Sequence, residues 1–169
     1  MDRSPPEEPR EEETEPSKDT MPEHWTMHFD GAFSCQNGGV GIMLTTPKGD
    51  KLYYAVQLCF VIDKISNNIA EFEGLLAGLR AAIALGVQRL LIKVDSQLLV
   101  NFSNKSYTPK DGHMAAYLEE VRKIEKHFKG MELMHIPRKE NSETDEIAKR
   151  ASRRQPQEAD VFEIGRAHV

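Results

Sequence analysis

The sequence has little cysteine and no long apolar run. Its two cysteines, Cys35 and Cys59, have no metal-ligand spacing, so we expect free thiols in a reducing compartment. No apolar stretch approaches the length of a membrane span, and the N-terminus lacks the apolar region of a signal peptide. We therefore expect an intracellular protein, not secreted and without a membrane partner, and the sequence leaves cytoplasm and nucleus open. The 169 residues suffice for one ordinary domain with a core.

A strongly basic balance, which is typical of many nucleic-acid-binding domains, is also missing. Residues 1–22 carry 3 basic and 8 acidic groups, whereas residues 23–154 carry 18 basic and 16 acidic groups, a net charge of +2. Residues 155–169 have a net charge of −2. The acidity therefore lies in the tails, and the central part neither excludes a polyanionic partner nor indicates one by charge alone.

The composition divides the chain into three parts. Residues 1–22 are rich in Glu, Pro and Ser, which predicts a disordered acidic tail that serves as a linker or an interaction segment. Residues 23–153 are expected to form one domain, and residues 154–169 a second disordered tail. Residues 163–169, EIGRAHV, match the translation of a common sequencing-adapter sequence. We hypothesise that they are an assembly artefact and that the natural chain differs beyond residue 162.

Hydrophobic periodicity predicts the order β-β-β-α-β-α-α-β-α. Three strands joined by short polar turns come first, which is typical of an antiparallel meander. The expected strands are residues 25–30, 40–46, 51–58, 89–94 and 131–136, and the expected helices are residues 68–85, 96–103, 113–128 and 141–151. We therefore expect an α/β fold with a five-stranded mixed sheet, in which strands 1–3 are antiparallel, strands 4 and 5 are parallel, and helices cover both faces.

Four carboxylates stand at junctions between these elements. Asp30 is expected to end the first strand and Asp95 the fourth, while Glu71 is expected in the first turn of the first long helix. Asp145 is expected one turn into the last helix, where a surface ion pair with Lys149 is the simpler explanation for it alone. Four carboxylates that can meet at one sheet edge would repel one another, and Mg²⁺ or Mn²⁺ would relieve the repulsion. Two such ions suit in-line phosphoryl displacement.

Four sequence stretches resemble the signatures of the type 1 ribonuclease H domain. These stretches are FDGA, NNIAEFEGLLAGL, VDSQLLV and IPRKENSETDEIAKRA. The resemblance covers roughly residues 23–153 and is strongest to the reverse-transcriptase-associated variant in polyproteins of plant gypsy-class retrotransposons. It implies a ribonuclease H-like fold and an endoribonuclease that cleaves the RNA strand of RNA–DNA hybrids by two-metal hydrolysis.

The resemblance also assigns roles to individual residues. Asp30, Glu71, Asp95 and Asp145 match the catalytic carboxylates that hold two Mg²⁺ ions, for which Mn²⁺ can substitute. The implied partners are the RNA–DNA hybrid and a polymerase domain or other parts of a polyprotein. The residues expected to contact nucleic acid are Gly31, Asn67, Asn68, Ser96, Gln97 and Arg138.

Some of these substrate contacts have simpler explanations, and two family features are absent. Ser96 and Gln97 equally suit a helix N-cap and first turn. The basic protrusion of some relatives is missing, because residues 101–112 contain only two lysines. His135 fits a strand position better than the mobile loop histidine of some relatives, and whether it assists catalysis stays open.

Two other functions remain to be weighed against hybrid cleavage. A catalytically silent nucleic-acid-binding or interaction domain could keep the same fold, although the intact carboxylate set argues against it. A receiver-like α/β module with an acidic Mg²⁺ pocket is disfavoured, because its regular βα alternation conflicts with the opening three-strand meander.

Overall fold

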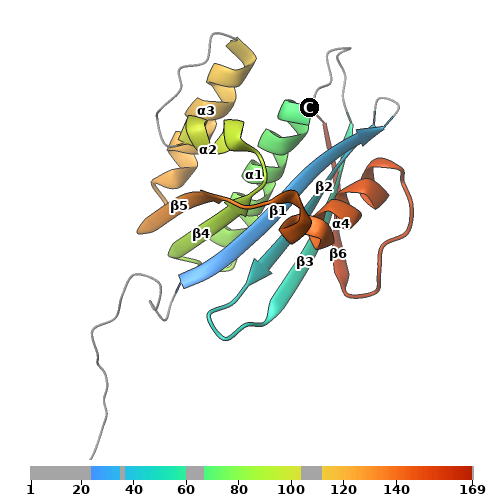
Figure 1. Ribbon diagram of the computed structural model, residues 1–169, viewed down its shortest axis with the longest axis horizontal. Coiled ribbons are helices and arrows are strands. Elements are labelled where there is room, and N and C mark those ends of the chain that lie inside the picture. The colour runs from blue at the N-terminus through green and yellow to red at the C-terminus, as the bar shows by residue number, and fades with distance from the viewer. Residues whose placement is uncertain (1–23, 35–36, 60–66, 104–111, 169) are drawn as a thin grey trace, which may run out of the picture.

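The computed structural model describes residues 24–34, 37–59, 67–103 and 112–168, which form a mixed sheet with helices on both faces (Figure 1). The strands are β1 His24–Ser34, β2 Asn37–Thr45, β3 Lys51–Cys59, β4 Arg89–Val94, β5 Gly130–His135 and β6 Val161–His168. Their order in the sheet is β5-β4-β1-β2-β3-β6. The pairs β1–β2 and β2–β3 are antiparallel, and β1–β4, β4–β5 and β3–β6 are parallel. The expected mixed sheet is confirmed, with a sixth strand added.

The helices cover the two faces unequally. They are α1 Asn67–Ala84, α2 Gln97–Ser103, α3 Gly112–Glu125 and α4 Ser142–Ser152, with a 3-10 turn, η3 Arg138–Asn141, before α4. Helix α1 packs on β1 and β2 from one side, and α4 packs on β1, β2 and β3 from the other (Figure 1). Helix α3 lies against α1, and α2 lies beside β4 and β5. None of the described helices is long and apolar enough to cross a membrane.

The main core fills the space between the sheet and α1. Met27 and Phe29 alternate on β1 and are fully buried, as expected for a period-2 strand. Leu75 and Leu79 are buried from the helix side. Strand β4 has the predicted bounds and buries Ile92 in the same cluster. Burial of this apolar surface is the main term that stabilises the sheet and α1 together.

Two glycines on β2 allow α4 to lie directly on the sheet. A Cβ atom added at Gly41 would meet the backbone carbonyl oxygen of Thr144 and would lie 2.9 Å from Cβ of Ile147. A Cβ at Gly39 would likewise meet backbone atoms of α4. The nearest contacts at both positions are with backbone atoms, which cannot rotate away as a side chain can, so the close packing of α4 requires glycine at both positions.

Three details of the predicted elements are wrong. Strand β1 does not end at Asp30 but continues to Ser34, because its residues beyond Asp30 pair with β2. Helix α1 begins at Asn67, so Glu71 falls beyond the first turn. The tail predicted to be disordered forms β6 over Val161–His168 instead. The proposed origin of residues 163–169 stays a hypothesis.

Contacts with β2 and β3 hold the end of the chain, from Arg154 after α4 to β6, against the sheet. Arg154, at φ 56°, donates hydrogen bonds to the carbonyl oxygens of Gly38 at 3.0 Å and Leu58 at 2.8 Å. Phe162 on β6 then stacks on Tyr54 of β3 with ring centroids 5.6 Å apart. Strand β6 has no strong apolar pattern, and it is held by backbone pairing with β3 and by the Arg154 contacts that precede it.

We predict that Gly41→Ala lowers the free energy of unfolding by about 2 kcal/mol, because the new methyl group overpacks the contact with α4. Urea unfolding followed by circular dichroism measures this change. Gly130→Ala is the matched control, because a Cβ at Gly130 meets nothing nearer than the Arg89 side chain at 3.8 Å. Equal effects of the two substitutions would contradict the packing argument.

Candidate metal centre

The register of β1 and β4 brings two aspartates level with each other. The parallel pairing runs through His28 and Lys93, and Asp30 and Asp95 lie two residues further along each strand. Residues two apart on a strand share a face, so the two carboxylates emerge on the same side. Asp95 directly follows the last residue of β4, at the carboxyl end of the strand where α/β sheets build their sites.

Helix α1 supplies the third carboxylate through a close backbone contact. A Cβ added at Gly31 would lie 2.6 Å from the carbonyl carbon of Ala70, so glycine lets α1 approach β1 here. Glu71, the next residue of α1, thereby reaches Asp30. One carboxylate oxygen from each of Asp30, Glu71 and Asp95 lies within 4.8 Å of the other two. Three of the four predicted carboxylates therefore form one cluster.

The environment of the cluster disfavours its own negative charge. Asp30 is 6% exposed, and burial followed by the charge of Asp95 raises the pKa of its carboxyl group. Burial followed by the charge of Asp30 raises the pKa of Glu71, and the Gly31 backbone amide opposes this rise. The same amide donates a hydrogen bond to Asp30 Oδ1 at 3.0 Å. Two buried carboxyl groups thus need either protons or a cation.

A divalent cation fits this donor set. Glu71 Oε1 is buried and has no hydrogen-bond partner among the described residues, which is costly for a carboxylate oxygen. All the side chains of the cluster offer hard oxygen ligands, as Mg²⁺ and Mn²⁺ prefer. A cation would supply the missing partner and relieve the repulsion together.

Asp145 lies beside the cluster without belonging to the group of three. It is in the first turn of α4 and lines a pocket of about 260 Å³ together with Asp30 and Glu71. Its interactions with Asp30 further raise the pKa of that carboxyl group. Asp145 also makes an ion pair with Lys149 at 2.9 Å. Both the surface pair and the proximity to Asp30 expected from the sequence are therefore present.

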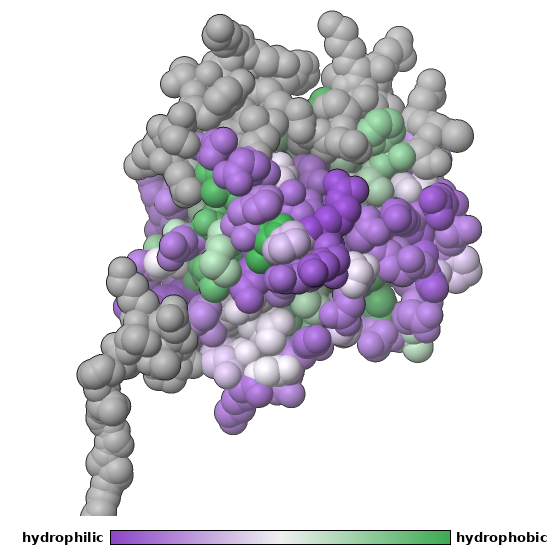
Figure 2. Space-filling view, in the orientation of Figure 1, coloured by the Kyte–Doolittle hydropathy of each residue, from purple (hydrophilic) through white to green (hydrophobic). Residues whose placement is uncertain are grey.

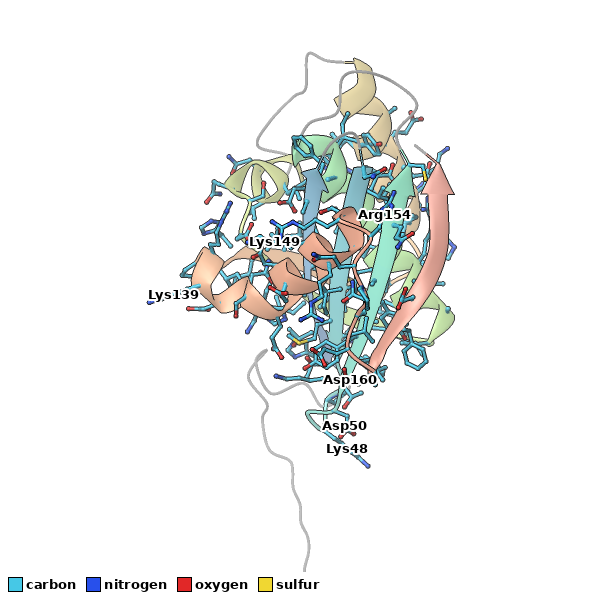
Figure 3. The ribbon with its side chains drawn as sticks, turned by 90° about the vertical axis from the view of Figure 1, so that its right-hand side faces the viewer. Lys48, Asp50, Lys139, Lys149, Arg154 and Asp160 are labelled. Carbon is cyan, nitrogen blue, oxygen red and sulfur yellow. The ribbon has the colours of Figure 1, made fainter. Side chains whose placement is uncertain are left out.

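Basic side chains border the same pocket. The pocket is lined by Arg138 of η3, by Lys149 of α4 and by Arg153, which directly follows α4. Figure 3 shows Lys149 on α4 and Lys139 at the outer end of the preceding turn. Figure 2 shows hydrophilic residues over α4 and a smaller hydrophobic area over β4 and β5. The acidic cluster thus opens beside a basic border.

The remaining predicted substrate contacts are only partly described. Ser96 Oγ accepts a hydrogen bond from the Leu99 amide at 3.3 Å and so caps α2, and Gln97 Nε2 donates to Asn101 Oδ1 at 3.1 Å. Asn67 and Asn68 begin α1, but their side chains lie outside the described part of the chain. Their roles toward nucleic acid stay predictions.

Three further expectations can be checked against the described residues. His135 is the last residue of β5 and is exposed, so its assignment to a strand is confirmed. Cys59 is a free thiol. Cys35, the acidic residues 1–22 and the two lysines of residues 101–112 lie outside the described part of the chain.

The sequence reasoning missed Asn141 as a site residue. It stands four residues before Asp145, an N-x-x-x-D spacing within the stretch IPRKENSETDEIAKRA. Its side chain is buried and donates a hydrogen bond to Asp95 Oδ2 at 3.1 Å. The pattern was the available signal, but the partner lies 46 residues away in sequence.

Comparison with known families gives one match over most of the chain. The sequence profile described as reverse transcriptase-like matches residues 28–151. A bifunctional protein of Mycobacterium tuberculosis is 28% identical over 87 residues, which are 52% of this chain and 24% of that protein. Ribonuclease HI of Halobacterium salinarum is 27% identical over 124 residues, 73% of this chain and 62% of that enzyme. The chain thus matches about a quarter of the mycobacterial protein.

Solved structures show the same fold. The crystal structure of ribonuclease H1 from Halobacterium salinarum has a TM-score of 0.69 at 25% identity, covering 76% of this chain and 96% of that one. The structure of LC11 ribonuclease H1 in complex with an RNA/DNA hybrid has a TM-score of 0.68 at 22% identity, covering 77% and 97%.

We predict that Asp30→Asn stabilises the metal-free protein, increasingly so as pH rises. The folded-state pKa of Asp30 is raised, so its contribution to stability is complete below the unfolded pKa and is lost as pH rises through the folded value. Asparagine carries no charge, so its advantage grows by about 2 kcal/mol between pH 5 and pH 8. Urea unfolding in EDTA at both pH values measures it.

The control for this experiment is Glu132→Gln, which changes an exposed carboxylate on β5. Its effect on the free energy of unfolding should stay within about 0.5 kcal/mol at both pH values. If the gain in free energy of unfolding caused by Asp30→Asn did not grow with pH, ionisation of Asp30 would not destabilise the metal-free fold, and the prediction would be wrong.

Proposed function

Because the chain belongs to the reverse transcriptase-like family and has a type 1 ribonuclease H fold, we propose that it is an endoribonuclease that cleaves the RNA strand of RNA–DNA hybrids. The single observation that carries the proposal is the cluster of Asp30, Glu71 and Asp95 within this fold. The Halobacterium relative, named a ribonuclease HI, and the hybrid bound to LC11 ribonuclease H1 support the substrate class.

The proposed cofactors are two Mg²⁺ ions, with Mn²⁺ as a substitute. Asp30, Glu71 and Asp95 would hold them, and Asp145 would complete the ligand set from α4. When bound, such ions stabilise the charge that develops on a phosphate during in-line attack by water. This assignment is supported by the hard oxygen donors and by Glu71 Oε1, which is buried and has no hydrogen-bond partner among the residues that the structure describes.

The protein groups around the cluster have separate tasks in this proposal. The Gly31 amide orients Asp30 through its hydrogen bond, and the Ala70 contact keeps Glu71 within reach. Arg138, Lys149 and Arg153 would meet the phosphate backbone of the hybrid, which positions a nucleic acid without reading its sequence. Asn67 and Asn68, at the start of α1, would contact the minor groove, where the 2′-hydroxyl distinguishes RNA from DNA.

We further propose a retroelement context. The family description, reverse transcriptase-like, supports a chain that works beside a polymerase domain or within a polyprotein. An intracellular location follows from that setting. Co-expression and co-purification with a retroelement polymerase domain tests this context, and failure of the two to associate would count against it.

We predict that the full chain cleaves the RNA strand of a labelled RNA–DNA hybrid in the presence of Mg²⁺ and that EDTA abolishes the cleavage. Duplex RNA and duplex DNA should remain intact. Asp30→Asn should lower the rate by at least about a hundredfold, because it removes a charge at the centre of the cluster. Gel analysis of end-labelled strands measures this, with Glu132→Gln as the variant expected to keep full rate.

Folded wild-type protein that binds the hybrid but never cleaves it, even in Mn²⁺, would contradict the proposal. That outcome would instead indicate a catalytically silent nucleic-acid-binding domain. Full activity of Asp30→Asn would contradict the assignment of the metal ligands.

We predict a different kinetic effect for Arg138→Ala. An exposed guanidinium that meets phosphate contributes to binding through counterion release, so its loss should raise KM several-fold with little change in kcat. The salt dependence of KM should also become shallower. Lys126→Ala, an exposed lysine just after α3 on the other side of the sheet, is the control. A fall in kcat alone would contradict the phosphate-binding role.

A further inference from the structure

A buried pair of polar residues joins α4 to both aspartate-bearing strands. Asn141 is 2% exposed and Thr144 is fully buried. The Asn141 side-chain amide donates to the carbonyl oxygen of Phe29 at 2.8 Å and to Asp95 Oδ2 at 3.1 Å. Thr144 Oγ1 donates to Asn141 Oδ1 at 2.5 Å and also lies 3.0 Å from the Asn141 carbonyl oxygen.

The hydrogen-bond inventory of this pair is complete. An asparagine side chain has two N–H donors, and here one goes to β1 and the other to the carboxylate that follows β4. If the amide were turned over, its oxygen would face the Phe29 carbonyl and the Asp95 carboxylate, which repel it. Thr144 favours the observed orientation, because its hydroxyl lies nearer to the amide oxygen, at 2.5 Å, than to the Asn141 carbonyl oxygen, at 3.0 Å.

The position of Asn141 in the chain makes this arrangement informative. Asn141 is the N-cap residue of α4, where an asparagine side chain ordinarily accepts a hydrogen bond from an amide of the first turn. Its side chain makes no such capping bond here. The Asn141 side chain instead donates to Asp95 and Phe29, so helix capping does not explain the presence of asparagine at this position.

We propose that Thr144 and Asn141 form a positioning pair for the metal site, in which Thr144 fixes the orientation of the Asn141 amide and Asn141 fixes the Asp95 carboxylate. This inference rests on the proposed function, because it assigns the pair to the same metal ligands. Both act through Asp95, and Asn141 additionally holds the β1 backbone at the residue before Asp30.

The substitution that separates the roles of Thr144 is Thr144→Val, compared with Thr144→Ser. Valine keeps the shape of threonine and removes the hydroxyl, whereas serine keeps the hydroxyl and removes a methyl group. With the amide no longer fixed, Asp95 is free to leave its metal-binding position. Loss of such a supporting hydrogen bond typically weakens metal affinity about tenfold.

The main readout needs no substrate. The thermal unfolding temperature of the full chain is measured against Mg²⁺ concentration, since a ligand of the folded state raises it by mass action. We expect the Mg²⁺ concentration for half-maximal stabilisation to rise about tenfold in Thr144→Val and to stay within about twofold of wild type in Thr144→Ser. In the cleavage assay, the Mg²⁺ dependence should shift likewise while KM for the hybrid stays unchanged.

A double-mutant comparison tests whether the two residues act as one unit. Asn141→Ala should weaken Mg²⁺ binding in the same direction, and adding Thr144→Val to it should produce little further change. If the two substitutions weakened Mg²⁺ binding in a fully additive way, the proposal that Asn141 and Thr144 act as one unit would be wrong. If Thr144→Val does not give folded protein by circular dichroism, Thr144→Ala replaces it against the same serine control.

The possible failures are distinguishable. Equal Mg²⁺ midpoints for Thr144→Val, Thr144→Ser and wild type would overturn the positioning pair, whereas hybrid cleavage by wild type would leave the proposed function standing. A wild type that is stabilised by Mg²⁺ but does not cleave the hybrid would overturn the proposed function. The Mg²⁺ concentrations for half-maximal stabilisation of the variants would still show whether Thr144 and Asn141 act as a positioning pair. A wild type that Mg²⁺ does not stabilise at all would overturn the pair.

Discussion

Mutual repulsion among buried carboxylates is the constraint around which this domain is built. Asp30, Glu71 and Asp95 come from a strand, a helix and the end of a second strand, and Asp30 is buried while Glu71 and Asp95 are half-buried. Burial, followed by the charges of the neighbouring carboxylates, raises the pKa values of Asp30 and Glu71, so the ionised cluster is unfavourable without a cation. An arrangement that is unfavourable for stability and favourable for cation binding is the usual sign of a functional site.

Close backbone approach is what makes the convergence possible. Gly31 lets α1 lie directly on β1, and Gly39 and Gly41 let α4 lie directly on β2 from the opposite face. Ordinary side chains at these positions would separate the helices from the sheet by a layer of atoms. Glu71 and Asp145 would then move away from Asp30. The glycines thus link the packing of the fold to the geometry of the site.

Much of this arrangement could be predicted from the sequence, and the failures have physical causes. Strand β4 has the predicted bounds because it is rich in apolar residues, of which Leu90, Ile92 and Val94 are buried. The end of β1 was misplaced because Gly31 suggested a turn, whereas pairing with the glycine-rich part of β2 extends the strand to Ser34. Strand β6 was missed because it joins β3 by backbone hydrogen bonds, which leave little trace in residue type.

The site divides in the same way. The carboxylates were predictable because an acidic residue at the end of an element carries its chemistry in its own side chain. Asn141 stands at a fixed spacing before Asp145, but the tasks of Asn141 and Thr144 were not predictable, because an amide and a hydroxyl acquire a task only from their partners. Those partners lie 46 and 112 residues from Asn141 along the chain and meet it only after the sheet and α4 have packed. Residue type therefore indicates which groups do the chemistry, whereas the groups that orient them emerge only from long-range hydrogen bonding.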